Sequence, residues 1–275
     1  MAEGFFIYPI RGEKLQTRVQ VEKTLCSFQS GFQNIEIIET AAFGKMLLLD
    51  GHVQLAELDE HAYHEALVHL PLMSMNQPKS ALVVGGGDGG VLRELCRWES
   101  IEHIDMVEID EAVIRLCREH LPSRNNGAFD DPRVHLTIGD AFPFVKEASR
   151  QYDLIVADAT DVYEGEEGNL SEALFTEEFY RDLARLLSPQ GVVVTQADNL
   201  LFCPYSLDGI FESFKPVFAN VGSYWAMVPS FGGFSGYAWG GVTGTVDLKW
   251  NGRLPKGLKH LTPEVVALAS KPLPF

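Results

Sequence analysis

A chain of 275 residues can form one large domain or a main domain with a small companion. Its hydrophobic content of 46% is ordinary for a globular protein with a substantial core and argues against general disorder. Acidic residues outnumber basic ones by 38 to 22, and the net charge of −16 argues against a nucleic-acid-binding surface, which needs basic patches. The charge suits a cationic ligand, although many soluble acidic proteins bind none.

Cysteine spacing and hydropathy narrow the class of protein further. The four cysteines are scattered and include no C-x-x-C pair, so neither a zinc site nor a disulfide framework is indicated. Buried free thiols in a reducing compartment are expected instead. The first residues show no signal-peptide pattern, and no stretch approaches ~20 apolar residues. We therefore expect a soluble, cytoplasmic protein that does not bind a membrane.

Short strand patterns dominate the first part of the chain. Residues 15–55 contain alternating segments, and "KMLLLDGHVQLA" predicts two short strands around Asp50-Gly51, which is a strong hairpin signal. We predict a small antiparallel β domain over residues 1–57. From residue 58 the period becomes helical, because Ala62, Leu67 and Leu70 recur at roughly helical spacing.

Strands and helices alternate after Pro78. The strand-like segments are "SALVVGG", "HIDMVEI", "RVHLTIGD", "YDLIVADAT" and "GVVVTQAD", and the helix-like ones between them are "GVLRELCRW", "DEAVIRLCREHL", "AFPFVKEAS" and "TEEFYRDLARLL". This βαβ rhythm predicts an α/β fold with an open, mostly parallel, Rossmann-like sheet and helices on both faces. We assign it to a second domain over residues 58–275, in which residues 221–241 predict two further strands, antiparallel at one edge.

Acidic residues follow the first three of these strands. Ligands of open α/β sheets bind beyond the carboxyl ends of the strands, where Asp88, Glu108 and Asp140 are expected to lie. An acid after the second strand commonly accepts the ribose hydroxyls of an adenine nucleotide or nucleoside. Asp140 is placed to accept a hydrogen bond from an adenine amino group. It can also cap the helix that follows, and both roles are compatible.

The glycine loop after the first strand admits two interpretations. Gly85, Gly87 and Gly90 satisfy the G-x-G-x-x-G pattern of dinucleotide sites, which is weak evidence when it stands alone. A pyrophosphate bound there would be opposed by Asp88. A nucleoside that carries a positive charge would be attracted by the same acid, and this second interpretation is favoured.

Two more acids follow the fourth strand. Asp158 and Asp161 in "VADATD" begin an exposed loop, where one of them could serve in a turn. Two carboxylates above a cleft are also suited to bind and deprotonate amines. The next residues add Glu164, Glu166 and Glu167, which could form either a solvated acidic loop or a lid over residues 163–168 that attracts cations.

Motifs along nearly the whole chain resemble the polyamine aminopropyltransferases, the spermidine synthase family. The segments that carry the resemblance are "GFQNIEI", "FGKMLLLDGHVQLAELDEHAYHEALVHLPL", "VVGGGDGGVLREL", "VEIDEAVI", "IGDAF", "YDLIVADATD" and "LFTEEFYRDLARLLSPQGVVVTQ". The resemblance implies a small N-terminal β domain before a Rossmann-like core of the methyltransferase type. It also implies transfer of the aminopropyl group of decarboxylated S-adenosylmethionine to a di- or polyamine, with release of methylthioadenosine.

The resemblance also implies roles for individual residues. It implies that Asp158 accepts the proton of the acceptor amine, which Tyr63 and Asp161 hold. The residues expected at the nucleoside and its aminopropyl group are Gln33, Gln54, His64, Gly85, Gly87, Asp88, Glu108, Asp140 and Ala141, and those expected at the acceptor are Tyr63, Asp88, Asp158, Asp161 and Phe231. No metal and no permanently bound cofactor is expected, and the family suggests a homodimer or homotetramer.

Departures from the family pattern leave the acceptor open. Val162 stands where the family usually has proline, and Phe231 stands where spermidine synthases often have tyrosine. Putrescine is the expected acceptor, with spermidine and agmatine as alternatives. A methyltransferase, an NAD-dependent dehydrogenase and a catalytically silent polyamine-binding protein are the competing hypotheses. Asp88 argues against the first two, and a complete set of ligand-type residues argues against the third.

Overall fold

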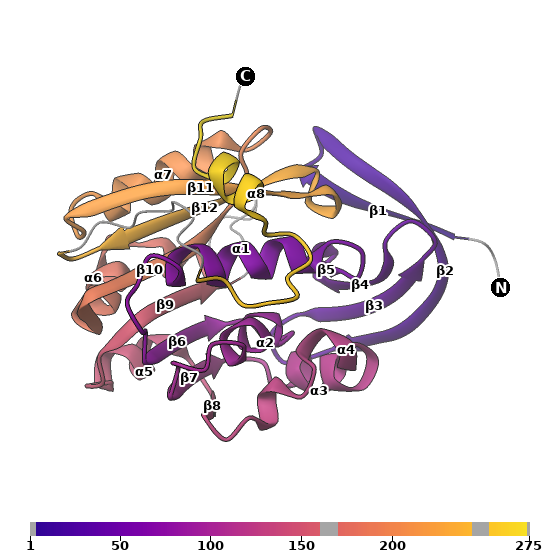
Figure 1. The fold of residues 1–275 in the computed structure, drawn as a ribbon. Helices are drawn as coiled ribbons and strands as arrows, with labels where there is room; N and C mark the ends of the chain where they lie inside the picture. Colours follow the sequence, from indigo (N-terminus) through magenta and orange to yellow (C-terminus); the bar gives the residue numbers. More distant parts are fainter. Residues whose placement is uncertain (1–3, 160–169, 244–252, 274–275) are drawn as a thin grey trace.

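The computed structural model describes residues 4–159, 170–243 and 253–273, which form two β-sheets (Figure 1). The first sheet is antiparallel and its strands follow chain order: β1 (Gly4–Arg11), β2 (Leu15–Gln29), β3 (Asn34–Thr40), β4 (Gly44–Leu49) and β5 (His52–Ala56). The predicted hairpin is confirmed, since Asp50-Gly51 joins β4 to β5. The sequence did not predict β1, which pairs with β2 alone and is therefore an edge strand.

The second sheet has seven strands in the order β11-β12-β10-β9-β6-β7-β8. Their bounds are β6 (Ser80–Gly85), β7 (His103–Glu108), β8 (Val134–Ile138), β9 (Tyr152–Asp158), β10 (Leu187–Asn199), β11 (Asn220–Val228) and β12 (Gly233–Gly241). The strands from β8 to β10 are parallel, and β12 runs antiparallel to both β10 and β11. These pairings confirm the predicted α/β fold with two antiparallel strands at one edge.

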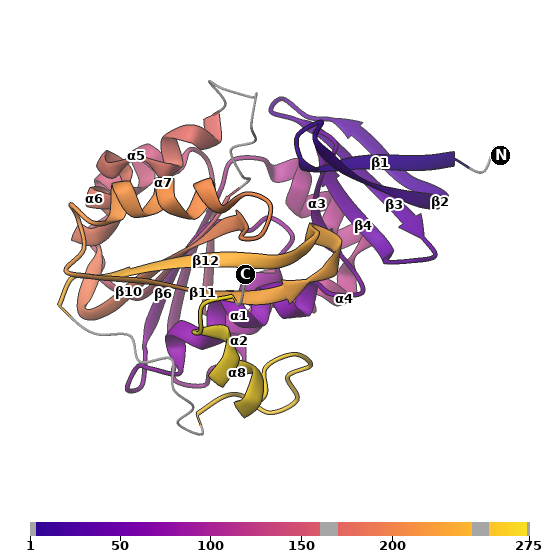
Figure 2. The same cartoon turned by 90° about the horizontal axis from the view of Figure 1, so that it is seen from above.

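Helices cover both faces of this sheet (Figure 2). Along β6, Ala81 and Val83 pack on one side with α1 and α2, whereas Leu82 and Val84 pack on the other side with α5, α6 and α7. The helices are α1 (Glu60–Leu72), α2 (Gly90–Cys96), α3 (Glu111–His120), α4 (Pro122–Asn125), α5 (Ala141–Glu147), α6 (Glu177–Arg185), α7 (Pro204–Phe214) and α8 (Pro263–Ala269), with short 3-10 turns η1 (Ala128–Asp130), η2 (Leu170–Phe175) and η3 (Pro229–Phe231). Successive side chains of β6 are buried on opposite faces of the sheet. This explains the continuous apolar run along β6, which is typical of strands covered on both faces.

Helix α3 joins the two sheets. Its residues Val113 and Leu116 pack in one hydrophobic cluster with Ile35, Leu47 and Leu49 of the N-terminal sheet. Asp110 caps the helix, because its side chain accepts a hydrogen bond from the amide of Ala112 at 3.0 Å. This cluster places the N-terminal sheet beside the carboxyl ends of the parallel strands.

Helix α1 is buried along almost its whole length. One side faces the large sheet, and the segment before α8 crosses near the other side (Figures 1 and 2). The Glu65 carboxylate holds that segment, since it accepts hydrogen bonds from the amides of Lys259, His260 and Leu261 at 2.7 to 2.9 Å. The C-terminal region thereby fixes the helix that carries Tyr63 and His64.

Within the described ranges, no helix has both the length and the apolar character needed to cross a membrane.

Candidate active site

A cavity of about 460 Å³ opens where the parallel strands end. Both sheets contribute to its wall. Leu49 and Gln54 come from strands of the N-terminal sheet and Gln33 from the loop between β2 and β3, while the rest of the wall comes mainly from the loops after the parallel strands. Strand order changes direction between β6 and β9, and this switch point is where open α/β sheets bind ligands. The cavity therefore lies where the topology predicts a site.

Most of the predicted site residues meet in this cavity. The lining includes Gln33, Gln54, Tyr63, Gly85, Gly87, Asp88, Glu108, Asp140, Ala141, Asp158 and Phe231. His64 was predicted to line the cavity, but it lies behind the wall with 1% of its surface exposed. Asp161, Val162 and the acidic residues Glu164, Glu166 and Glu167 lie outside the described residues.

The glycine loop brings the ends of β6 and β9 together. Gly85 is paired with Asp158 in the sheet register, and the Gly86 amide donates a hydrogen bond to the Asp158 carbonyl at 3.0 Å. Gly85 has φ of +79°, and a side chain there would run into the Asp158 carbonyl. The glycine at this position therefore permits close contact between two strands.

Asp88 turns back onto the helix that it precedes. Its Oδ1 accepts a hydrogen bond from the Gly90 amide at 2.6 Å and lies 3.3 Å from Nε2 of His64. Asp140 also bonds the following helix, since it accepts from the Phe142 amide at 2.9 Å and caps α5. The capping role considered for Asp140 is thus confirmed, and both acids still face the cavity.

Glu108 lies at the end of β7 with 7% of its surface exposed. Burial raises the pKa of Glu108 to about 7, although its side chain accepts the Asp110 amide at 2.9 Å. Asp110 also accepts hydrogen bonds from Ser30 at 2.6 Å and Gln33 at 3.0 Å. Asp110 was not predicted as a site residue, and its bond to Gln33 links the cavity wall across the gap between the two sheets.

Asp158 is tied to α1 through Tyr63. The Tyr63 hydroxyl donates a hydrogen bond to Asp158 Oδ1 at 2.6 Å, and the Tyr63 ring meets the Phe231 ring edge to face at 5.5 Å. Burial and then the charge of Asp88 raise the pKa of Asp158 to about 6, against the opposing effects of His64 and of the Tyr63 hydrogen bond. A carboxylate with this pKa is ionised at neutral pH and is still basic enough to accept a proton.

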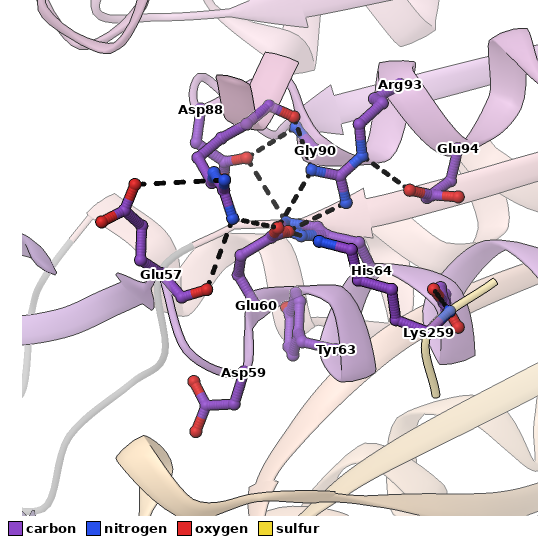
Figure 3. A network of polar contacts seen from close by, with 12 residues as sticks. Glu57, Asp59, Glu60, Tyr63, His64, Asp88, Gly90, Arg93, Glu94 and Lys259 are labelled. Atoms are coloured by element: carbon purple, nitrogen blue, oxygen red, sulfur yellow. Dashed lines mark hydrogen bonds and ion pairs between the residues drawn. The ribbon is translucent and has the colours of Figure 1, made fainter. Parts of the chain in front are cut away.

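His64, Asp88 and Asp158 each offer a ligand-type atom within 4.8 Å of the others. The two nitrogens of His64 face two different carboxylates, Glu60 at 2.7 Å and Asp88 at 3.3 Å (Figure 3). Burial alone would lower the pKa of His64, but Asp88 and Glu60 outweigh burial and raise it to about 10. In the protonated imidazole both nitrogens carry a hydrogen, so His64 presents a positive charge to Glu60 and to Asp88.

Three further polar residues line or support the cavity and were not singled out from the sequence. Gln196 and Asp198 lie near the end of β10, and the Gln196 side chain donates to the Ala159 carbonyl at 3.1 Å. Asp59 accepts hydrogen bonds from the amide and hydroxyl of Ser230 at 2.7 and 2.8 Å, which fixes the turn before Phe231. The one local sequence signal for Asp198 was its position in "TQAD", where polar residues appear at the end of an apolar strand.

Comparisons with known proteins agree with this geometry. Residues 60–249 match the model of the spermine/spermidine synthase domain, and residues 7–57 match that of the spermidine synthase tetramerisation domain. A polyamine aminopropyltransferase of Sulfolobus acidocaldarius is 39% identical over 232 residues, which are 84% of this chain and 76% of that protein. One of Salmonella newport is 35% identical over 270 residues, which are 97% of this chain and 87% of that protein.

Solved structures give the same answer. The crystal structure of a spermidine synthase in complex with the transition state analogue AdoDATO has a TM-score of 0.89 and 29% identity to this chain. The match covers 99% of this chain and 93% of that one. Both the catalytic core and the N-terminal sheet are therefore shared, and the chain belongs to the spermine/spermidine synthase family of aminopropyltransferases.

Proposed function

We propose that this protein transfers the aminopropyl group of decarboxylated S-adenosylmethionine to a di- or polyamine and releases methylthioadenosine. The observation that carries the proposal is the pair of acids Asp88 and Asp158 in one cavity beside Tyr63, where a phosphate would be repelled and a cationic amine attracted. Putrescine is the first acceptor to test, and spermidine, spermine, cadaverine and agmatine complete the panel. No metal and no permanently bound cofactor takes part in this proposal.

The reaction is a direct displacement. The lone pair of the acceptor nitrogen forms a bond to the methylene carbon beside the sulfonium, and the carbon–sulfur bond breaks with its electron pair left on neutral methylthioadenosine. Asp158 takes the proton that the new ammonium loses. Alignment of nitrogen, carbon and sulfur supplies on the order of 7 kcal/mol or more, and a positioned base adds roughly 10²–10⁴-fold.

Glu108 and Asp140 bind the nucleoside in this proposal. A carboxylate at the end of β7 accepts the ribose hydroxyls, and Asp140 accepts from the adenine amino group while its other bonds hold α5. Gln33 and Gln54 close the nucleoside pocket from the N-terminal sheet. Glu108 must be ionised for this role, so nucleoside affinity is expected to fall as the pH drops below the pKa of about 7.

Turnover separates this proposal from its alternatives. Purified protein is incubated with decarboxylated S-adenosylmethionine and each amine, and the products are identified by mass spectrometry. Release of methylthioadenosine with a lengthened polyamine supports the proposal. Methylation of the acceptor from intact S-adenosylmethionine would support a methyltransferase, and binding without release would support a silent polyamine-binding protein.

We expect Asp88→Asn to reduce the preference for decarboxylated over intact S-adenosylmethionine. The decarboxylated form lacks a carboxylate near its amine, so Asp88 attracts it and repels the parent molecule. The asparagine oxygen can still accept the Gly90 amide, so the variant removes charge and keeps the local hydrogen bond. Calorimetric dissociation constants for both nucleosides test this, and an unchanged ratio would exclude Asp88 from the discrimination.

The second charge of a diamine needs its own acid, and we assign it to Asp198. This residue lines the cavity, and its amide donates to Gln196, whose side chain also bonds the residue after Asp158. Asp198 has φ of 55°, in the left-handed region that costs energy for residues other than glycine. Burial raises the pKa of its carboxyl, and a bound ammonium would act in the opposite direction by favouring the charged form.

We expect Asp198→Asn to raise KM for putrescine about tenfold, since a hydrogen bond to a charged group contributes roughly 1.5 kcal/mol. The asparagine oxygen can still accept the Asn199 amide, and asparagine tolerates the left-handed conformation. A monoamine of similar length provides the control, because it lacks the second charge and its kcat/KM should not change. Asp208→Asn, on the exposed face of α7, is the matched control variant. Equal effects on diamine and monoamine would rule out the assignment.

Assembly and domain limits are also proposed. We assign residues 1–57 to an N-terminal domain and residues 58–275 to the catalytic domain, and we propose a homodimer or homotetramer. The match of residues 7–57 to a tetramerisation domain supports the assembly, as do the exposed side chains of Phe5 (54%) and Ile7 (53%) on the edge strand β1. Mass photometry at several concentrations measures the assembly directly.

A further inference from the structure

We propose that Glu60 is a positioning residue, which acts through His64 to hold Asp88 in place and to keep Asp158 ionised. Glu60 begins α1, has 3% of its surface exposed and is not part of the cavity wall. It lies behind His64, with His64 between it and Asp88 (Figure 3). The kinetic test of this inference depends on the proposed function, whereas the titration of His64 does not.

Two arginines fix the orientation of Glu60. Arg93 of α2 donates to both of its oxygens, at 2.9 and 3.1 Å, and Arg124 of α4 donates to Oε1 at 3.1 Å. Oε2 also accepts from Nδ1 of His64 at 2.7 Å. Burial would raise the pKa of Glu60, but His64 and Arg93 hold it well below its usual range. Glu60 is therefore a fixed negative charge behind the imidazole.

His64 lies at the centre of a charged network. Glu60, Asp88 and Asp158 are the acids beside it, on α1, on the loop after β6 and at the end of β9. Arg93 and Arg124 pair with Glu60 behind the imidazole, and they also pair with Glu94 and Glu57, respectively. Tyr63 adds an uncharged ring, edge to face with the imidazole at 5.2 Å. His64 is the one cation of this cluster that faces Asp88 and Asp158, so its proton decides whether these two acids can both be ionised.

The consequence for catalysis follows from repulsion between like charges. Two carboxylates that share a site cannot both ionise easily, and one of them takes up a proton unless a cation lies beside them. A protonated Asp158 cannot accept the proton of the product ammonium. Because Glu60 stabilises the imidazolium, it keeps Asp158 available as a base from a position that never touches substrate.

We expect Glu60→Gln to move the acid limb of the pH profile of kcat/KM for the acceptor amine, measured at saturating nucleoside, upward by roughly 1 unit or more. The amide can still accept the Nδ1 proton but supplies no charge, and Arg93 and Arg124 are left to repel a protonated His64. Glu60→Asp keeps the charge and should retain the wild-type acid limb, even if kcat falls through altered geometry. That rescue separates the role of the charge from that of the contact.

Glu94→Gln is the matched control variant. Glu94 is equally buried, with 1% exposed, and bonds Arg93 at 2.6 Å and a second buried histidine, His69, at 2.9 Å. It lies on α2 and does not contact His64. Its loss costs stability but should leave the acid limb where it is in the wild type.

The protonation of His64 gives a measurement that does not depend on turnover. The ring resonance of His64 is assigned by its absence in His64→Gln and titrated in the wild-type protein by nuclear magnetic resonance. We expect His64 to remain protonated well above neutral pH in the wild type and in Glu60→Asp, and to lose its proton at a lower pH in Glu60→Gln, where Asp88 alone supports the charge.

These outcomes decide the inference in every case. A wild-type His64 that titrates below pH 7 overturns it, even if Glu60→Gln fails to fold. An unchanged acid limb in folded Glu60→Gln, or an equal shift in Glu94→Gln, also overturns it. Absence of aminopropyl transfer by the wild type would reject the proposed function, whereas the titration of His64 would still test the link between Glu60 and His64.

Discussion

Asp158→Asn is expected to lower turnover by at least ~10²-fold, as the loss of a general base does. The asparagine oxygen can still accept the Tyr63 hydroxyl, so the geometry at 2.6 Å is preserved and only the basic group is lost. In the wild type at saturating nucleoside, kcat should fall as the pH drops through about 6, because Asp158 must be ionised to accept a proton and its pKa lies there. Rapid-quench measurement of methylthioadenosine release tests both statements.

Stability and binding provide the controls for Asp158→Asn. The pKa of Asp158 in the folded protein is higher than its ordinary value of 3.8, so its ionisation reduces stability as the pH rises through about 6. The variant should therefore melt at the wild-type temperature or above at neutral pH, and should still bind methylthioadenosine. Near-wild-type turnover in the folded variant would remove Asp158 from the mechanism.

Gly90→Ala is expected to lower kcat/KM on the order of 10²-fold, the effect of misplacing a positioned group by about 1 Å. A Cβ at Gly90 would overlap three ring atoms of His64. Alanine gains about 1 kcal/mol of helix propensity over glycine, but overpacking in a core costs roughly 1–3 kcal/mol. The clash outweighs the gain, because His64 is held between Glu60 and Asp88 and cannot move aside.

Gly209→Ala is the control for this substitution. Gly209 lies on the exposed side of α7, and a Cβ there would meet nothing within 4 Å. It should gain the helix propensity alone and melt slightly higher without any change in kinetics. If Gly90→Ala behaves in the same way, the imidazole is not confined as the structure indicates.

The glycine motif illustrates how far sequence reasoning reaches. The pattern of Gly85, Gly87 and Gly90 predicted a ligand loop, and Gly85, Gly87 and Asp88 do line the cavity. The reason for two of these glycines is different, however. Gly85 permits contact with the Asp158 carbonyl, and Gly90 makes room for the His64 ring. Both neighbours come from other elements, so spacing along the chain cannot indicate them.

Local sequence patterns predicted most strands and helices of the α/β domain, but they did not predict the hydrogen bonds and ion pairs around Glu60. Alternating apolar segments predict buried parallel strands, and Asp50-Gly51 predicts a hairpin, because the causes of both are local. From the sequence alone, Glu60 cannot be distinguished from an ordinary polar residue in the first turn of a helix. Its partners Arg93 and Arg124 are brought to it by tertiary packing, and no spacing in the sequence encodes that meeting.

The burial of α1 has a consequence for the kind of selectivity that this enzyme can show. A helix enclosed by the sheet and tied to the C-terminal segment by Glu65 has lost its conformational entropy during folding. Tyr63 and His64 therefore do not need to be ordered when an amine binds, and the binding energy is not reduced by that cost. The same rigidity prevents α1 from adapting to a bulkier acceptor. A wider range of acceptors would have to arise from other residues of the cavity wall, such as Gln196 and Asp198.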